Sequence, residues 1–169
     1  MIPPSPWEVR HLAQVPASGR ILDLACGSGR HARWLAAQGR SVLAVDRDQS
    51  ALAGLQALPG VAVLAADLET DDWPLAGQRF AGVVVTNYLW RPRLADVCAL
   101  LAPGGALIYE TFMVGNEAYG KPSNPDFLLR PHELRAVAKA AGLREIAFEE
   151  GYTATPKPAL RQAICAVRE

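Results

Sequence analysis

A short apolar run that ends in a glycine loop constrains the fold of this chain more than any other feature. The run covers residues 20–25, and the loop follows at residues 27–29, Gly-Ser-Gly. A helix is expected to continue through Trp34 and Leu35 and to close at Gly39, because glycine often ends helices in a left-handed conformation. A buried strand, a glycine turn and a helix in this order indicate the first unit of a doubly wound sheet.

The same alternation of apolar runs and helical segments continues along the chain. Strands are expected at residues 41–46, 61–66, 80–86 and 106–111, helices at residues 48–58, 92–101 and 131–141, and a loop at residues 67–78. Continuous apolar runs are typical of parallel strands that are buried on both faces. The last two strands, at residues 143–148 and 159–167, have no helix between them and should pair antiparallel. The predicted fold class is therefore α/β, a doubly wound, mostly parallel seven-stranded sheet that ends in an antiparallel hairpin.

A short helix is predicted before the first strand. Ser5 and Glu8 have capping-box spacing around Pro6, so the helix should lie within residues 1–16 and end at about Gln14. Trp7 lies on this helix, where it can either close a ligand pocket or serve in packing alone.

The composition is that of one globular domain spanning residues 1–169. No apolar run approaches the roughly 20 residues of a membrane helix, and the first residues lack the pattern of a signal peptide. Formal charges balance at 17 against 17 without a basic run, so neither a membrane nor a nucleic-acid partner is expected. The cysteines have neither disulfide nor metal spacing, which favours a cytoplasmic protein without a metal site; they are Cys26, Cys98 and Cys165.

The glycine loop alone does not identify its ligand. Residues 27–32 fit the dinucleotide pattern G-x-G-x-x-G/A, and Asp46 suits a ribose diol in either case. Asp23 distinguishes the alternatives, because it places an acid on the strand four residues before the first glycine. A pyrophosphate gains nothing from a nearby carboxylate, whereas the ammonium and sulfonium groups of S-adenosylmethionine do. The alternative for Asp23 is a helix cap or a buried ion pair.

On these residues the chain resembles the class I S-adenosylmethionine-dependent methyltransferases over essentially its whole length. Asp23, Ala25, Gly27 and Gly29 stand where the family motif D-x-G-x-G-x-G lies, with alanine in place of the first glycine. That exchange is mild if the φ angle of Ala25 stays negative. The resemblance implies a Rossmann-like fold, S-adenosylmethionine as cofactor, and a set of cofactor-binding residues: Asp23, Ala25, Cys26, Gly27, Ser28, Gly29, Asp46, Arg47, Asp67, Leu68, Asn87 and Tyr88.

Residues 113–130 form the most individual segment of the chain. Long loops inside compact domains are usually functional or disordered, and Tyr119, Phe127 and Leu128 argue against disorder. We therefore predict a substrate lid, with a purely structural Ω-loop as the alternative. The sequence of residues 109–127 resembles that of a group of small bacterial methyltransferases often described as tellurite-resistance-like. This resemblance implies that the methyl acceptor is a small molecule.

The acceptor should bind beyond the carboxyl ends of the strands. Glu110 ends the fifth strand and is the candidate general base, with anchoring of the loop as its alternative. The candidate substrate contacts are Trp7, Trp90, Phe112 and Tyr119, and Trp90 can instead pack in a helix interface.

The predicted function is methyl transfer from S-adenosylmethionine to a small molecule. The alternatives are an RNA or protein methyltransferase that works with a partner, a catalytically silent S-adenosylmethionine-binding module, and an NAD-binding oxidoreductase. The sequence indicates neither the acceptor nor the oligomeric state.

Overall fold

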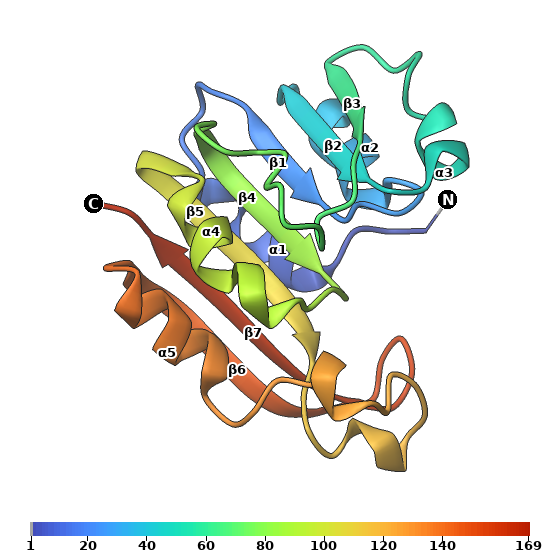
Figure 1. The fold of residues 1–169 in the computed structure, drawn as a ribbon, viewed down its shortest axis with the longest axis vertical. Helices are drawn as coiled ribbons and strands as arrows, with labels where there is room; N and C mark the ends of the chain where they lie inside the picture. Colours follow the sequence, from blue (N-terminus) through green and yellow to red (C-terminus); the bar gives the residue numbers. More distant parts are fainter. Residues whose placement is uncertain (1) are drawn as a thin grey trace.

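The computed structural model describes residues 2–169, and these form one seven-stranded sheet in the order β3-β2-β1-β4-β5-β7-β6 (Figure 1). Neighbouring strands from β3 to β5 run parallel, whereas β7 runs antiparallel to both β5 and β6. The predicted fold class, including its terminal hairpin, is therefore confirmed. The strands are β1 (Ile21–Leu24), β2 (Val42–Asp46), β3 (Val61–Ala65), β4 (Phe80–Thr86), β5 (Leu101–Phe112), β6 (Arg144–Thr153) and β7 (Ala159–Val167).

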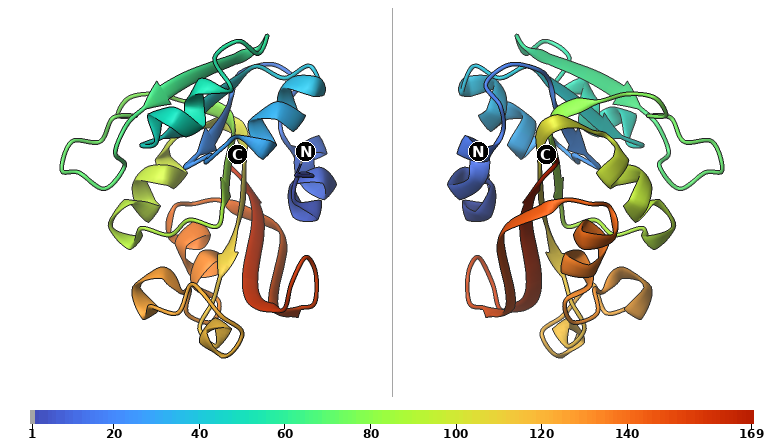
Figure 2. Two further views of the ribbon diagram at one scale, coloured as in Figure 1. Left: turned by 90° about the vertical axis from the view of Figure 1, so that its right-hand side faces the viewer. Right: turned by 90° about the vertical axis from the view of Figure 1, so that its left-hand side faces the viewer.

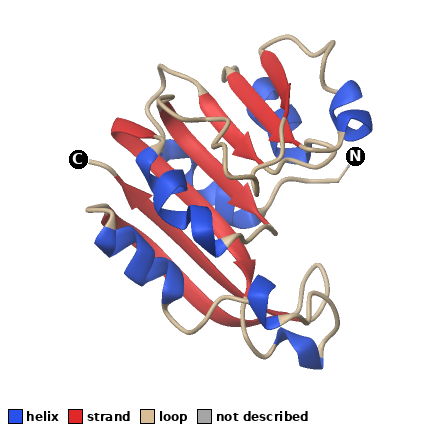
Figure 3. Ribbon diagram, viewed as in Figure 1, coloured by secondary structure: helices blue, strands red, loops and turns tan. Residues whose placement is uncertain are grey.

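Helices cover both faces of the sheet (Figure 3). One apolar core joins α4 and α5 to one face, and the other joins α1, α2 and α3 to the opposite face. Figure 2 shows this division at the end of the sheet, where α1 and α5 lie on opposite sides of the terminal strands. The helices are α1 (Pro6–His11), α2 (Arg30–Ala37), α3 (Gln49–Ala53), α4 (Leu94–Ala99) and α5 (Glu133–Ala140), with 3₁₀ turns η1 (Leu12–Gln14), η2 (Arg91–Arg93), η3 (Asn116–Ala118) and η4 (Pro125–Phe127).

Several predicted boundaries were wrong. The helix after Asp48 ends at Ala53 rather than at residue 58, because Gly54 favours its end and Leu55 turns inward to full burial. The helix predicted at 92–101 begins as the 3₁₀ turn η2 and ends at Ala99, and the next strand already starts at Leu101. The final helix starts at Glu133 rather than at residue 131, and β6 continues to Thr153 instead of ending at residue 148.

The topology brings the functional residues to one edge of the sheet. The carboxyl ends of the parallel strands β1, β2, β3, β4 and β5 meet there, as parallel pairing requires. The antiparallel partner β7 starts at the same edge and places Arg161 opposite Phe112. Within residues 2–169, no helix has the length and apolar character needed to cross a membrane.

Candidate functional site

The loop after β1 is shaped by left-handed backbone. Gly27 and Gly29 have φ angles of 57° and 84°, and Ala25 has a φ angle of 54°. The expectation of a negative φ at Ala25 was therefore wrong, because the chain turns sharply as it leaves β1. A side chain at Gly29 would be strained at this φ angle, and its Cβ would lie 2.5 Å from a methyl group of Leu55, which would have to move. A Cβ added at Gly27 would have no other atom within 4 Å, so at this residue the backbone of the loop faces open space.

Asp23 lies beneath this loop. Its side chain is 2% exposed, and Oδ2 accepts a hydrogen bond of 3.0 Å from the Ala32 N–H in the first turn of α2. Burial raises the pKa of this carboxyl to about 7. The contact is the one expected from the helix-cap interpretation, and contact between Asp23 and the cofactor stays a prediction.

A first cavity of about 250 Å³ lies at the ends of β1 to β4. Asp46 is fixed in its wall, because Oδ2 accepts from the Gly27 N–H at 2.9 Å and Oδ1 accepts from the Asp48 N–H at 2.9 Å. Most lining residues are predicted cofactor contacts, and the sequence analysis missed only Ala66 and Glu69. The lining comprises Ala25, Asp46, Arg47, Ala66, Asp67, Leu68, Glu69, Asn87 and Tyr88. This lining fits an adenosyl cofactor. It offers carboxylates for the ribose hydroxyls, apolar and aromatic side chains for the adenine, and an open glycine backbone beside them.

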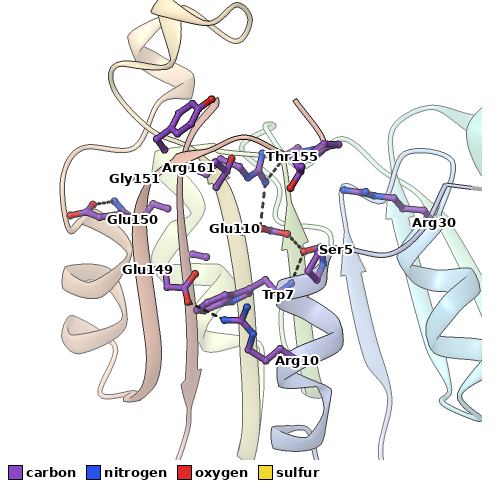
Figure 4. A pocket seen from close by; sticks show the side chains of 17 residues that line it. Ser5, Trp7, Arg10, Arg30, Glu110, Glu149, Glu150, Gly151, Thr155 and Arg161 are labelled. Atoms are coloured by element: carbon purple, nitrogen blue, oxygen red, sulfur yellow. Dashed lines mark hydrogen bonds and ion pairs between the residues drawn. The ribbon is translucent and has the colours of Figure 1, made fainter. Parts of the chain in front are cut away.

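A second cavity of about 320 Å³ lies between α1, the end of β5 and the β6–β7 hairpin (Figure 4). Of the predicted substrate and catalytic residues, Trp7 and Glu110 line it. Sequence reasoning missed Ser5 and Arg161, because residues 5 and 161 come together only in the folded chain. Asn87 lines both cavities, so the two meet at the end of β4.

Glu110, Arg161 and Asn87 form one polar network in the second cavity. The Ser5 hydroxyl donates to Glu110 Oε1, and Arg161 Nη2 lies 3.6 Å from Glu110 Oε2. The same Nη2 donates to Asn87 Oδ1 at 2.7 Å. Asn87 has a φ angle of 58°, and its N–H donates to the Glu110 carbonyl at 3.0 Å. The network therefore fixes the residue at which the cavities meet.

A buried acid–histidine pair lies next to this network, and the sequence analysis did not predict it. Glu8 is 1% exposed, and its Oε2 lies 3.2 Å from His31 Nε2, which also accepts from the Ser5 N–H at 3.0 Å. Burial, assisted by the nearby carboxyls of Asp23 and Glu110, raises the pKa of Glu8 to about 9. Burial lowers the pKa of His31 to about 4. Both side chains are therefore uncharged at neutral pH.

The loop at residues 113–130 is anchored to the sheet. Asn116 is 2% exposed, its Nδ2 donates to the Pro122 carbonyl, and its Oδ1 accepts from the Leu160 N–H, both at 3.0 Å. No loop residue lines either cavity among the residues that the structure describes. Tyr119 nevertheless contacts the second cavity's wall, because its ring centroid lies 5.5 Å from that of Tyr152. The lid function stays a prediction.

The other predicted substrate contacts lie outside the cavity linings. The Arg161 guanidinium carbon lies 4.6 Å from the centre of the Phe112 ring, so Phe112 supports a lining residue. Trp90 is half-buried and precedes the 3₁₀ turn η2. In the described part of the chain, no cluster of three or more His, Cys, Asp or Glu side chains is arranged to hold a metal ion.

Comparison with known protein families assigns the chain to one of them. A family model described as a methyltransferase domain matches residues 21–105, which is half of the sequence. The chain belongs to this methyltransferase family. The prediction of a class I S-adenosylmethionine-dependent methyltransferase is thus confirmed, and with it the cofactor. No curated protein sequence matches this methyltransferase.

Solved structures share the fold of the methyltransferase at low sequence identity. TehB from Haemophilus influenzae superposes with a TM-score of 0.77 at 17% identity, over 96% of this chain and 62% of that one. The methyltransferase thus spans less than two thirds of that TehB chain. A methyltransferase from Methanosarcina mazei gives 0.72 at 16% identity and 99% coverage of both chains. The 1,6-didemethyltoxoflavin-N1-methyltransferase of Burkholderia thailandensis, solved with S-adenosylhomocysteine, gives 0.71 at 21% identity, covering 96% of this chain and 76% of that one.

Proposed function

We propose that the protein transfers a methyl group from S-adenosylmethionine to a small-molecule acceptor bound in the second cavity. The observation that carries the proposal is the position of Asn87, which borders both the predicted cofactor cavity and the cavity beside it. When bound, the cofactor supplies a methyl group on a sulfonium, which is already an activated leaving group. The chain's own residues then have to align the acceptor, exclude water and remove any proton that the acceptor loses.

Asp46 is proposed to bind the ribose hydroxyls, and Asp67 with Leu68 the adenine. Glu110 is proposed to receive the proton of a hydroxyl or amine acceptor, a contribution of typically about 10²–10⁴-fold. Its carboxylate lies in the second cavity rather than in the cofactor cavity, which supports this role. The alternative role of anchoring the loop has less support, since the partners of the Glu110 side chain are Ser5 and Arg161.

A small acceptor is supported by the size of the second cavity, which at about 320 Å³ lies at the lower end of small-molecule sites. The Burkholderia thailandensis neighbour is named for 1,6-didemethyltoxoflavin and was solved with that compound bound. An RNA or protein acceptor presented by a partner, or a silent cofactor-binding role, are the alternatives. A bacterial, cytoplasmic enzyme is proposed as well, which agrees with the free thiols of its three cysteines.

Calorimetric titration with S-adenosylmethionine, S-adenosylhomocysteine and NADH tests the cofactor assignment. We expect micromolar binding of the two adenosyl sulfur compounds and none of NADH. A screen of small molecules with isotopically labelled methyl donor, read by mass spectrometry, then tests transfer. Binding of NADH alone would contradict the proposed function, and cofactor binding without transfer to any acceptor would favour the silent module.

A further inference from the structure

The charged side chains of the second cavity are paired unevenly. Arg10 and Glu149 form an ion pair at 3.0 Å. Glu150 contacts His132 Nδ1 at 3.2 Å and accepts from Gln162 Nε2 at 2.9 Å. Gln162 is uncharged and His132 carries a charge only when protonated, so Arg30 and Arg161 share the cavity with two carboxylates, those of Glu110 and Glu150.

Arg30 lies at the start of α2 beside the glycine loop, and its Nη1 donates to the Pro3 carbonyl at 3.3 Å. This position suits the cofactor side of the cavity. Arg161 lies across the cavity on β7, which is the acceptor side in the proposed function.

Arg161 is rigidly held but only partly satisfied. Its side chain is 16% exposed and stacks on Phe112, its partner across the β5–β7 pair. Nη2 binds Asn87 and lies near Glu110, whereas Nε and Nη1 have no hydrogen bond within residues 2–169. Burial lowers the pKa of this guanidinium, and the positive charge of Arg30 acts in the same direction, whereas Glu110 opposes it. A guanidinium with unused N–H donors can bind a carboxylate through charge-assisted hydrogen bonds.

We propose that Arg161 binds the methyl acceptor through a carboxylate group, so that the substrates are small organic carboxylic acids. This inference rests on the proposed function, because it assumes that the second cavity holds the acceptor. The carboxylate is the anchor, and the atom that receives the methyl group lies elsewhere on the acceptor, toward Asn87. Glu110 disfavours a second anion on its own side of the cavity, and Nη2 is engaged by Asn87, so the acceptor carboxylate accepts a single hydrogen bond from Nε or from Nη1 of Arg161.

The test is calorimetric titration of the chain saturated with S-adenosylhomocysteine, using matched pairs of carboxylic acids and their primary amides. The pairs are benzoate with benzamide, phenylacetate with phenylacetamide, and 4-hydroxybenzoate with 4-hydroxybenzamide. We expect at least one acid to bind about tenfold or more tightly than its amide, because hydrogen bonds to a charged group are stronger. The Arg161→Gln variant should reduce this ratio to about one, and Arg161→Lys should retain part of it.

Arg135→Gln is the matched control. Arg135 also stacks on a phenylalanine, at 4.1 Å from the Phe148 ring, and pairs with Glu145 at 2.7 Å, but it does not line the second cavity. This variant should keep the wild-type ratio. The affinity for S-adenosylhomocysteine is measured for each variant, so that a general loss of structure is recognised.

Two results would overturn the inference. One is that no acid binds more tightly than its amide while S-adenosylhomocysteine binds normally. The other is that the preference for acids survives in Arg161→Gln but is lost in Arg30→Gln. Failure of the wild-type chain to bind S-adenosylhomocysteine would instead contradict the proposed function itself.

Discussion

Two residues that border the cavities, neither of them glycine, adopt a left-handed backbone conformation. Ala25 and Asn87 have φ angles of 54° and 58°, in a region that costs a residue with a side chain on the order of 1 kcal/mol or more. Asn87 is held by bonds from Arg161 to its side chain and from its own N–H to Glu110. Such strain persists where surrounding contacts fix it, and here it directs the end of β4 between the two cavities.

Asp46 is the residue whose loss should most directly weaken cofactor binding. The Asp46→Ala variant is expected to lose roughly 2–3 kcal/mol of S-adenosylmethionine binding free energy, the scale of a pair of charge-assisted hydrogen bonds. It also loses the bond that fixes Gly27. Calorimetry measures the change. Asp48→Ala is the control, because Asp48 caps α3 and lies outside the cofactor cavity. Unchanged affinity in Asp46→Ala would refute the ribose assignment.

The buried Glu8 should make stability depend on pH. Its pKa is raised to about 9 in the folded chain, against an ordinary value of 4.5. Its stabilising contribution is therefore fully present below about pH 4.5 and is lost as the pH rises toward 9. Glu8→Gln cannot titrate, so we expect its unfolding free energy to exceed that of the wild type by more than about 1 kcal/mol at pH 8.

Urea unfolding of Glu8→Gln and wild type at pH 5, 7 and 9 measures this difference, which should grow with pH. Glu149→Gln serves as the control, since the side chain of Glu149 is 64% exposed and its replacement removes no buried carboxyl. A constant difference for Glu8→Gln would show that Glu8 is ionised in the folded chain.

Among the elements, the 113–130 loop is fixed by few but well-buried contacts. Met113 bridges to Leu129 at the base of the loop, and Leu128 and Leu129 are fully buried. Asn116 connects the loop to the start of β7 through Leu160. The loop is thus anchored at its base, while Tyr119 at its outer part is 49% exposed and reaches the second cavity only through Tyr152.

Removing the Asn116 side chain should loosen this loop. Asn116→Ala leaves the Leu160 N–H and the Pro122 carbonyl without their partner, a cost of about 1–3 kcal/mol in unfolding free energy. Hydrogen exchange should accelerate within residues 113–130 and much less in β1 and β4. Asn124→Ala removes an exposed cap of η4 and should cost less, so equal effects of the two variants would argue against an anchoring role.

At the scale of the whole molecule, residues 2–169 contain two apolar cores that share one sheet. Strand residues such as Val83 and Val84 face opposite cores, so neither core can form without the sheet. We therefore expect residues 1–169 to unfold in a single cooperative transition.

Cofactor binding should stabilise this folded state as a whole. S-adenosylhomocysteine at 100 times its dissociation constant adds about 2.7 kcal/mol, which corresponds to an increase in Tm of about 5–10 °C for a domain of this size. Differential scanning calorimetry measures the shift, and NADH at the same concentration is the comparison. Two separate transitions, or a shift with NADH alone, would contradict the single-domain description or the cofactor assignment.

The sequence alone was sufficient to predict the fold class and to single out most of the residues that line the first cavity. Apolar runs report buried parallel strands directly; Asp46 is the last residue of one such strand, and Asp67 and Asn87 follow the ends of two others. Positions at or just after the carboxyl ends of parallel strands necessarily meet at one edge of the sheet, so the local sequence pattern was enough to predict that these residues lie together. Helix ends were predicted less well, because the burial of Leu55 and Leu101 depends on neighbours far along the chain.

The second cavity was decided by tertiary structure. Ser5, Glu110 and Arg161 come from α1's N-cap, β5 and β7, and no local pattern reports that they share a cavity. The pKa of Glu8 likewise depends on burial against α2 and on the carboxyls of Asp23 and Glu110. Desolvation and long-range pairing are properties of the packed chain, whereas strand and loop patterns are properties of the sequence itself.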